Sequence, residues 1–561
     1  MVEGEKEKNK ARNPRLIIMN DIIDKEILGQ ILTTQEFKEW LISRRWFSHK
    51  SELSDMQFEV ELDYFEVIDG NIIITIIKIT KLGYDKSYFV PFIYFKDLAN
   101  FLEENERVEE NLLKLQENAF VGAMNLIEAE YCLLFWKKIF SKINFVVDLD
   151  ERFQYFIDVS KDPNKYHFSL KQLGEGNTTN LLFKVKIRKK DLPDQKLASL
   201  VVKSYKNYID NLEILKLTAL MKNDFKQAPK LVGSIKIKDH NTIGIVENVS
   251  NIGNIGFVYW KELNDMIFNV FEDLNGNYSQ LEDKNHVFEL ITRQCVTSLE
   301  FSSKIGQIIK KMHGALTVSD SENEIFHSEF VKSQKFLEPR VSKIHSIIIN
   351  LKFTIKQLTT NSFFDISQIN SILNDVSEIL GNLLFRIRDL SIKIQPIHQD
   401  LHMEQVLYDI VNDRYEFYFT DFEGDPQLSP EGKKKKLPVE KDMASFLRSL
   451  SYIKYNTLLG YINEKVTKSE SEESPEKILH DLLLLNQQRG KIQIIEILLR
   501  VLNIWENKLT EIILRDLESN LALQDFFTIE RTLQEINYEI LYRPDKIIVP
   551  LLGLKEMLRK K

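Results

Sequence analysis

Alternating apolar and polar positions predict β-strands in the first hundred residues. MQFEVELDYFEV (56–67) alternates, and NIIITIIKI (71–79) is rich in β-branched residues. Asp69-Gly70 separates them and favours a tight hairpin turn. KSYFVPFIYF (86–95) predicts a further strand, and TTQEFKEWLISRRWF (33–47) predicts a helix that begins at a Thr-Thr-x-Glu cap. We expect a charged tail and lead-in at 1–33 and a β-rich cap domain at 34–95.

The pattern changes after residue 95. Between 96 and about 145, apolar residues recur at spacings of three and four without a proline, which predicts helices. KDPNK (161–165) is rich in turn-forming residues and marks a boundary. We therefore expect a helical connector at 96–165.

The segment 166–250 again favours strands, with one helix. FSLKQLGEGNTTNLLFKVKI (168–187) predicts a strand, a glycine-rich loop and a second strand. KLASLVVKSY and TIGIVENV predict further strands, and NLEILKLTALMKN predicts a helix between them. Residues 251–561 are mostly helical in pattern, with one β-island at PIHQDLHMEQVLY and RYEFYFTDFEGDP. This order predicts an α+β, bilobal protein-kinase-like fold with an N-terminal addition, a nucleotide-binding lobe at 166–250 and a helical C-lobe at 251–561.

Composition excludes several classes of protein. The 561 residues contain 75 Lys plus Arg and 83 Asp plus Glu, a net charge of −8, so no overall field attracts nucleic acid or an anionic membrane. Two cysteines, Cys132 and Cys295, exclude a disulfide framework and a Cys-based zinc site, and we expect buried thiols. The charged N-terminus lacks a secretory pattern and charges interrupt every apolar run, so we expect a cytoplasmic protein. KKKK (433–436) and SESEESPE (469–476) predict exposed loops.

The β-island carries the strongest chemical pattern. Asp400 is followed five residues later by the amide of Gln405, a spacing typical of a kinase catalytic loop. Asp421 follows at the end of a strand, where a carboxylate can hold Mg²⁺. The set predicts Asp400 as the base, with Gln405 and Asp421 as the metal ligands.

A second set lies upstream. Lys203 interrupts an apolar strand and is costly there unless it is paired, and Glu213 on the following helix can pair with it. This pair would hold the nucleotide phosphates. The glycine-rich loop upstream supplies further candidates for binding the phosphates, namely Gly174, Gly176 and Thr178. The end of the later strand supplies backbone groups for the adenine edge, at Glu247 and Val249.

Three other residues have open interpretations. Asp442 opens a helix and is either an N-cap or a tie to the catalytic loop, and Arg448 on the same helix faces the acceptor or that loop. His313 is interpreted as structural. HQDLH (398–402) also resembles an H-x-D-x-H metal-hydrolase run, but the remaining histidines are scattered and no βα repeat accompanies it.

The blocks together resemble the maltokinases, a branch of the aminoglycoside-phosphotransferase-like kinases. PIHQDLHMEQVLY, TDFEGDP and EKDMASFLRSLSY are similar to that family's HGD-x-H-x-x-QVL, DFEGEP and RDVAGMLRSF. SRRWFSHK and INYEILYRPDKIIVPLLGL are similar to its first and last blocks, so the resemblance runs from about 36 to 554. Gln399 departs from it, because the family has glycine before the catalytic aspartate.

The resemblance implies ATP- and Mg²⁺-dependent phosphorylation of a sugar hydroxyl, with maltose as the favoured acceptor and maltose 1-phosphate as the product. His402, Glu423 and Arg448 would lie near the acceptor, and a trehalose synthase or another α-glucan enzyme would be a partner. Glucosamine kinases share the blocks, so glucosamine and trehalose stay open as acceptors. A non-catalytic kinase-like partner of a glucan enzyme is the alternative from another class.

Overall fold

A computed structural model describes residues 23–47, 50, 53–95, 112–118, 122–147, 149–174, 179–190, 196–273, 278–317, 324–358, 366–467, 474–481 and 492–559. The chain divides into two compact units. Unit 1 comprises Met1–Ile214 and Leu231–Asn248, and unit 2 comprises Leu215–Lys230 and Val249–Lys561.

The first half of unit 1 is a six-stranded antiparallel sheet in the order β1-β2-β4-β6-β5, with β3 paired to β2. Two short helices precede it. The elements are α1 (Lys25–Leu32), α2 (Gln35–Ser43), β1 (Glu59–Asp69), β2 (Ile72–Lys81), β3 (Tyr84–Phe89), β4 (Phe92–Phe95), β5 (Leu112–Asn118) and β6 (Gly122–Glu128).

Local sequence accounts for the expected starts and turns. The Thr34 side chain accepts the Phe37 N–H at 3.2 Å and caps α2, as its Thr-Thr-x-Glu pattern predicts. Gly70 takes φ +48° in the turn between β1 and β2, a conformation that suits glycine. The predicted hairpin and helix are confirmed.

The helical prediction for 96–145 is wrong for 112–118 and 122–128 and is confirmed at Leu133–Ile139. Residues 112–118 and 122–128 form strands β5 and β6, and helix begins only at α4 (Leu133–Ile139). β6 pairs with β4, which places Ile127 opposite Ile93. Pairing with a buried strand overrides the helical spacing, because the strand buries Leu126 and Ile127 and satisfies its backbone groups. Residues 96–111 lie outside the described residues.

The second half of unit 1 is another six-stranded antiparallel sheet, in the order β7-β11-β12-β10-β9-β8. A helix, α6, lies in sequence between its strands β10 and β11. The elements are β7 (Asn144–Phe145), α5 (Tyr155–Lys161), β8 (Tyr166–Leu173), β9 (Asn180–Lys189), β10 (Lys196–Tyr205), α6 (Leu212–Lys222), β11 (Leu231–Ile237) and β12 (His240–Glu247).

The two sheets of unit 1 share one hydrophobic core, which runs in sequence from Ile23 to Ile245. A buried ion cluster also joins them. Lys206 Nζ lies 2.9 Å from Glu128 and 2.7 Å from Glu130, and Trp46 Nε1 donates to Glu128 at 2.6 Å. The shared core and these buried ion pairs join the first and second sheets of unit 1 into one body.

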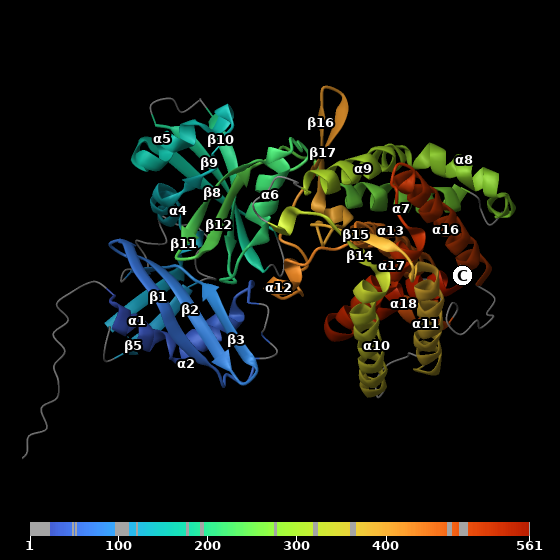
Figure 1. The fold of residues 1–561 in the computed structure, drawn as a ribbon, viewed down its shortest axis with the longest axis horizontal. Helices are drawn as coiled ribbons and strands as arrows, with labels where there is room; N and C mark the ends of the chain where they lie inside the picture. The colour runs from blue at the N-terminus through green and yellow to red at the C-terminus, as the bar shows by residue number, and fades with distance from the viewer. Residues whose placement is uncertain are drawn as a thin grey trace, which may run out of the picture. The chain divides into compact units, whose positions relative to one another are not determined.

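Unit 2 is mainly helical, with two small sheets (Figure 1). A three-stranded sheet has the order β13-β16-β17, and β14 pairs with β15. The elements are β13 (Gly253–Asn254), α7 (Ile255–Asp273), α8 (Lys284–Gln294), α9 (Val296–Ala315), β14 (Glu329–Lys332), α10 (Ser333–Leu358), α11 (Ile366–Ile387), β15 (Ser391–Ile394), β16 (Val406–Val411), β17 (Arg414–Phe419), α12 (Pro430–Lys433), α13 (Glu440–Tyr461), α15 (Pro475–Leu479), α16 (Ile492–Leu514), α17 (Leu521–Tyr542) and α18 (Ile548–Arg559).

The α+β class is confirmed, since unit 1 is built on two antiparallel sheets and unit 2 on helices with a β-island. The order of strands around α6, followed by helices that flank the β16–β17 hairpin, is the order expected for a kinase-like fold. α13 is the central helix of unit 2 and packs against α7, α16, α17 and α18.

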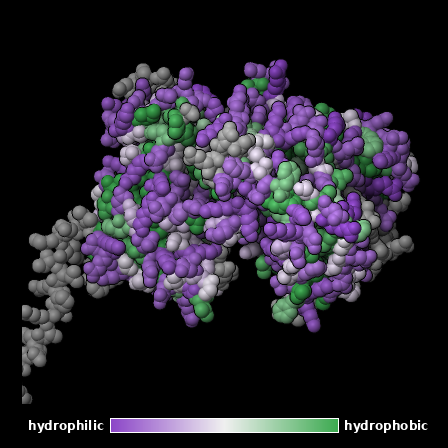
Figure 2. Space-filling view, in the orientation of Figure 1, coloured by the Kyte–Doolittle hydropathy of each residue, from purple (hydrophilic) through white to green (hydrophobic). Residues whose placement is uncertain are grey.

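Other expectations concern the surface and the thiols. Cys132 and Cys295 are free and buried, as predicted. Figure 2 shows mostly hydrophilic residues on the visible face, with hydrophobic residues in small separate groups. Across the described part of the chain, every helix is too short or too polar to span a bilayer.

Gly306 permits the closest contact between α9 and α16. A Cβ atom added at this position would lie 2.1 Å from the backbone oxygen of Ile513, whereas one added at Gly314 of the same helix meets nothing within 4 Å. We expect Gly306→Ala to lower the free energy of unfolding by about 1–3 kcal/mol, because the helices must separate. Gly314→Ala is the matched control and should raise it by roughly 0.5–1 kcal/mol, since alanine favours helix. Urea unfolding of both variants tests this, and equal effects would contradict the close-contact explanation.

Candidate functional site

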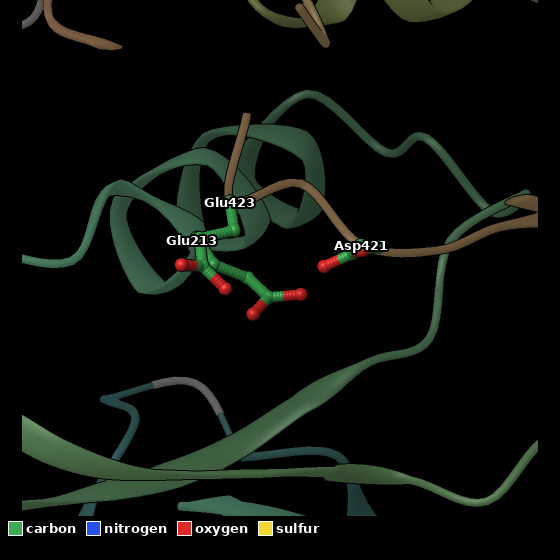
Figure 3. Close-up of side chains that lie close together, drawn as sticks. All are labelled: Glu213, Asp421 and Glu423. Carbon is green, nitrogen blue, oxygen red and sulfur yellow. The ribbon is translucent and has the colours of Figure 1, made fainter. Parts of the chain in front are cut away.

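Lys203 and Glu213 form a buried ion pair in unit 1. Lys203 Nζ lies 2.9 Å from Glu213 Oε2, and both residues are buried. Tyr205 Oη donates to the same carboxylate oxygen at 2.8 Å. The predicted pairing is therefore present, and Glu213 projects from the first turn of α6 (Figure 3).

Strand register positions this pair. Lys203 on β10 lies opposite Leu182 of β9 and Gly244 of β12. A Cβ at Gly244 would lie 2.7 Å from Tyr205 Oη, so the glycine leaves room for the hydroxyl that binds Glu213. The Glu213 carboxylate thus has two donors that hold it in place.

The phosphate-loop and adenine candidates are only partly described. Gly174 follows β8 with φ +79°, a conformation that suits glycine, whereas Gly176 and Thr178 lie outside the described residues. Glu247 ends β12 and its carboxylate pairs with Arg152 at 2.9 Å. The Val249 carbonyl accepts from Asn251 Nδ2 at 3.2 Å, so an adenine would compete with this side chain for that carbonyl. Their nucleotide roles stay predictions.

Asp442 anchors the loop that carries Asp400. Its two carboxylate oxygens accept the backbone N–H groups of His398 and Gln399, each at 2.8 Å. His313 Nε2 contacts the same carboxylate at 2.9 Å, and Asp442 is fully buried. Burial alone would raise the pKa of Asp442, but the bond from His313 and the nearby imidazoles hold it below its usual value. Asp442 is thus a tie to the loop and not a simple N-cap, and His313 is part of that tie.

Gln399 precedes Asp400 in a left-handed conformation with φ +78°, which is unfavourable for a residue other than glycine. Its side chain offsets this cost, because Nε2 donates to the carbonyls of Lys433 at 2.8 Å and Lys435 at 3.2 Å. Glycine, the residue of the maltokinase pattern at this position, takes such a φ without strain, whereas Gln399 takes it with its side chain bonded. The glutamine adds a tether to the segment around α12.

The expectation that KKKK (433–436) is simply an exposed loop is wrong. Lys433 is buried and its Nζ lies 3.1 Å from Glu423, and Lys436 pairs with Glu329 at 3.0 Å. The carbonyls of this segment are also used by Gln399. Lys433 and Lys436 are therefore held in ion pairs, whereas the Lys435 side chain is exposed.

Asp400 lies at a cavity of about 670 Å³ in unit 2. Its Oδ1 is 3.6 Å from Arg531 Nη1, and Arg531 Nε lies 3.3 Å from Glu535. Glu535 in turn pairs with Arg448 Nη2 at 2.8 Å. Sequence reasoning missed Arg531 and Glu535, because two opposite charges four apart on a helix ordinarily indicate a solvated face.

The lining of the cavity contains most of the residues predicted to lie near the acceptor, but not all of them. Asp400, His402 and Arg448 line it, whereas Glu423 does not and pairs instead with Lys433. A Cβ at Gly553 would lie 2.5 Å from Arg448 Nη1, so α18 closes on the guanidinium from behind. The aromatic lining, which includes Phe257, Trp260, Tyr452 and Tyr538, was not predicted.

Gln405 and Asp421 meet on the β-island. Gln405 Nε2 donates to Asp421 Oδ2 at 3.1 Å, and its Oε1 accepts from Thr420 Oγ1 at 3.4 Å. One carboxylate oxygen each of Asp421 and Glu423 lie within 4.8 Å of each other, and Figure 3 shows both residues on the loop after β17. Two carboxylates at this separation suit a divalent cation. Gln405 fits such an ion only after its amide turns to present oxygen.

The H-x-D-x-H interpretation gains no support from the described residues. His398 is buried and its Nε2 contacts the Thr420 carbonyl at 2.9 Å, while His402 Nε2 lies 3.3 Å from Gln405 Nε2. The two imidazoles and Asp400 do not gather their ligand atoms at one point in the described chain. Their spacing serves the loop, not a shared ion.

His398 predicts a loss of stability in acid. Burial lowers its pKa from the ordinary value of 6.5, so the folded protein resists protonation that the unfolded chain accepts. Stability is therefore complete above about pH 6.5 and falls as the pH drops toward the lowered folded pKa, by up to about 1.4 kcal/mol at pH 5.5. Urea unfolding of the native chain and His398→Gln at pH 7.5 and 5.5 measures this. A variant that loses as much stability as the native chain would contradict the assignment to His398.

Comparisons with known proteins give structural similarity only. No family model and no curated protein matches the sequence. A glucosamine kinase solved with glucosamine, ADP and inorganic phosphate is 11% identical, with a TM-score of 0.48 over 89% of this chain and 93% of that one. Plasmodium vivax ethanolamine kinase is 14% identical, with a TM-score of 0.30 over 77% and 94% of the two chains. A thermostable mutant of the aminoglycoside phosphotransferase APH(4)-Ia, with ADP and hygromycin B, is 9% identical, with a TM-score of 0.35 over 72% and 98%.

Proposed function

We propose that this protein is an ATP-dependent kinase that transfers the γ-phosphate of ATP to a hydroxyl group of a small sugar. The observation that carries the proposal is the position of Asp400. It projects into a cavity of about 670 Å³ from a loop anchored on buried Asp442, and thus can meet an acceptor hydroxyl there. Maltose is the favoured acceptor, on the resemblance of the sequence blocks to the maltokinases.

In this proposal Asp400 accepts the proton of the acceptor hydroxyl. The hydroxyl oxygen bonds to the γ-phosphorus, the bond from that phosphorus to the bridging oxygen of ADP breaks, and ADP leaves. Arg531 Nη1 lies 3.6 Å from Asp400 Oδ1, and this contact must loosen as the carboxylate accepts the proton. The anchors on Asp442 hold the loop so that little reorganisation is needed.

Unit 1 supplies the phosphate-binding cation. Lys203 is held by Glu213, with Gly174, Gly176, Thr178, Glu247 and Val249 as the further nucleotide residues. Asp421, with Glu423 beside it, would hold Mg²⁺, and Gln405 would join them after its amide turns. The ion, when bound, neutralises charge on the phosphates.

Two alternatives differ from this proposal, one in the acceptor and one in the class of function. Glucosamine or trehalose would be the acceptor of a same-fold sugar kinase. A non-catalytic partner of a trehalose or α-glucan enzyme would keep the fold without turnover, but Lys203, Glu213, Asp400, Gln405 and Asp421 are all present, and loss of one such residue is typical of that class.

An ATP-consumption screen tests the proposal. The full chain with ATP and Mg²⁺ is offered maltose, glucosamine, trehalose, glucose and maltotriose, and ADP formation is recorded for each. Turnover with at least one sugar supports a sugar kinase. ATP·Mg²⁺ binding by calorimetry without turnover of any sugar would contradict it, and co-purification with a glucan enzyme would then favour the non-catalytic alternative.

A further inference from the structure

Two aromatic side chains lie partly exposed in the cavity that contains Asp400. Phe257 and Trp260 project from the first turns of α7, and they are 58% and 39% exposed. Their ring centroids are 5.7 Å apart with an angle of 36° between the planes, so the two rings contact each other. Large rings are normally buried, and their exposure inside a polar cavity calls for an occupant.

The start of α7 is held against the loop of Asp400. A Cβ at Gly256 would lie 3.3 Å from Met403 Cβ, three residues beyond Asp400. β13 pairs Asn254 with Leu407 of β16, and the Asn254 side chain accepts the Phe257 N–H at 2.9 Å. The two rings therefore have a set position relative to the proposed base.

Other aromatic faces of the cavity are already covered. Tyr538 has the Arg543 guanidinium 5.5 Å from its ring and the ring of Tyr542 at 4.7 Å, and Tyr452 has Arg448 at 5.6 Å. Phe257 and Trp260 contact each other and still keep 58% and 39% of their surface exposed. They therefore offer aromatic surface to a ligand in the cavity.

Three of the acidic residues that line the cavity are paired with guanidinium groups of the same cavity, whereas Glu404 and Asp425 also line it. Asp400 faces Arg531, Glu535 pairs with Arg531 and Arg448, and Glu539 pairs with Arg543 at 2.7 Å. An ammonium group would have to displace a guanidinium to reach these carboxylates. Uncharged donors and acceptors also line the cavity; they are Asn254, Gln427, Ser445, Ser449, Asn456 and Gln534.

We propose that Phe257 and Trp260 form a stacking subsite for a second, uncharged sugar ring of the acceptor, beyond the ring that is phosphorylated. A pyranose has an apolar C–H face that packs on an aromatic ring and hydroxyls that bond to the surrounding amides and hydroxyl groups. The size of the cavity is in the range that holds ligands larger than one ring. This inference rests on the proposed function for the reacting ring, and it assigns new residues to specificity.

Steady-state kinetics of Trp260→Ala and Phe257→Ala with maltose and glucose test the subsite. We expect KM for maltose to rise about tenfold with little change in kcat, because a lost stacking contact of roughly 1.4 kcal/mol weakens binding by that factor. KM for glucose should stay nearly unchanged, and Trp260→Phe should recover most of the loss. Phe330→Ala removes a ring that is more exposed (70%) and lies outside the cavity, and it is the control. Equal effects on both sugars, or an equal effect of the control, would overturn the subsite.

Binding measurements separate this inference from the proposed function. Calorimetric titration of the full chain with maltose and with glucosamine needs no turnover. Maltose binding that depends on Trp260, without phosphorylation of any sugar, would retain the subsite and refute the kinase. Phosphorylation of glucosamine together with no binding of maltose would retain the kinase and refute the subsite.

Discussion

Asp400→Asn is expected to lower the rate of phosphoryl transfer by about 10²–10⁴-fold while ATP still binds. The amide keeps the shape of the side chain but cannot accept the proton of the acceptor hydroxyl. The backbone ties of the loop to Asp442 come from His398 and Gln399, so they survive the substitution. Calorimetry with ATP·Mg²⁺ and a turnover assay with a sugar that the native chain uses measure the two properties separately.

Asp409→Asn is the matched control for this variant. Asp409 lies on β16 of the same β-island but does not line the cavity, and its carboxylate accepts the N–H of Ile410. Its rate should equal that of the native chain. Asp400→Asn with native turnover would show that another group takes the proton.

Lys203→Met has the second large expected effect, and it combines two causes. Removal of Lys203 leaves the Glu213 carboxylate buried without the cation that pairs with it, which costs about 3–5 kcal/mol of stability. Removal of the cation should also weaken transfer from ATP, by about 10²-fold or more, because the phosphates lose their fixed charge.

The double variant Lys203→Met/Glu213→Gln separates the two causes. It removes the unpaired charge, so urea unfolding should show most of the stability restored. Its kcat/KM for ATP should stay as low as that of the single variant. Recovery of both stability and kcat/KM would mean that the pair is structural alone.

Sequence predicted the chemistry best where a pattern is local. The Asp400-to-Gln405 spacing, the strand before Asp421 and the strand-then-helix order around Lys203 are all short-range features, and the structure pairs Lys203 with Glu213 and Gln405 with Asp421. The cap of α2 and the turn at Gly70 are likewise local. The catalytic roles of Asp400, Gln405, Asp421 and Lys203 stay predictions.

Features that depend on distant partners were missed. Leu126 and Ile127 lie in a segment with helical spacing of its apolar residues, but β6 pairs with β4, a strand about 35 residues upstream. Arg531 and Lys433 appear in sequence as surface charges, and only the packing of α17 and α12 brings them to Asp400 and Glu423. Trp260 lines the cavity because β13 pairs with β16, a contact across about 150 residues. No single-sequence pattern records such pairings.

The central claim is a sugar kinase with Asp400 as its base, and phosphorus NMR of the reaction products tests it most directly. The full chain and its Asp400→Asn variant are incubated with ATP, Mg²⁺ and each sugar of the panel. The account predicts that the native chain converts ATP into ADP and a new sugar-phosphate resonance for at least one sugar, and that the variant forms neither at a comparable rate. Loss of ATP to inorganic phosphate alone, or the same sugar phosphate from both proteins, would contradict it.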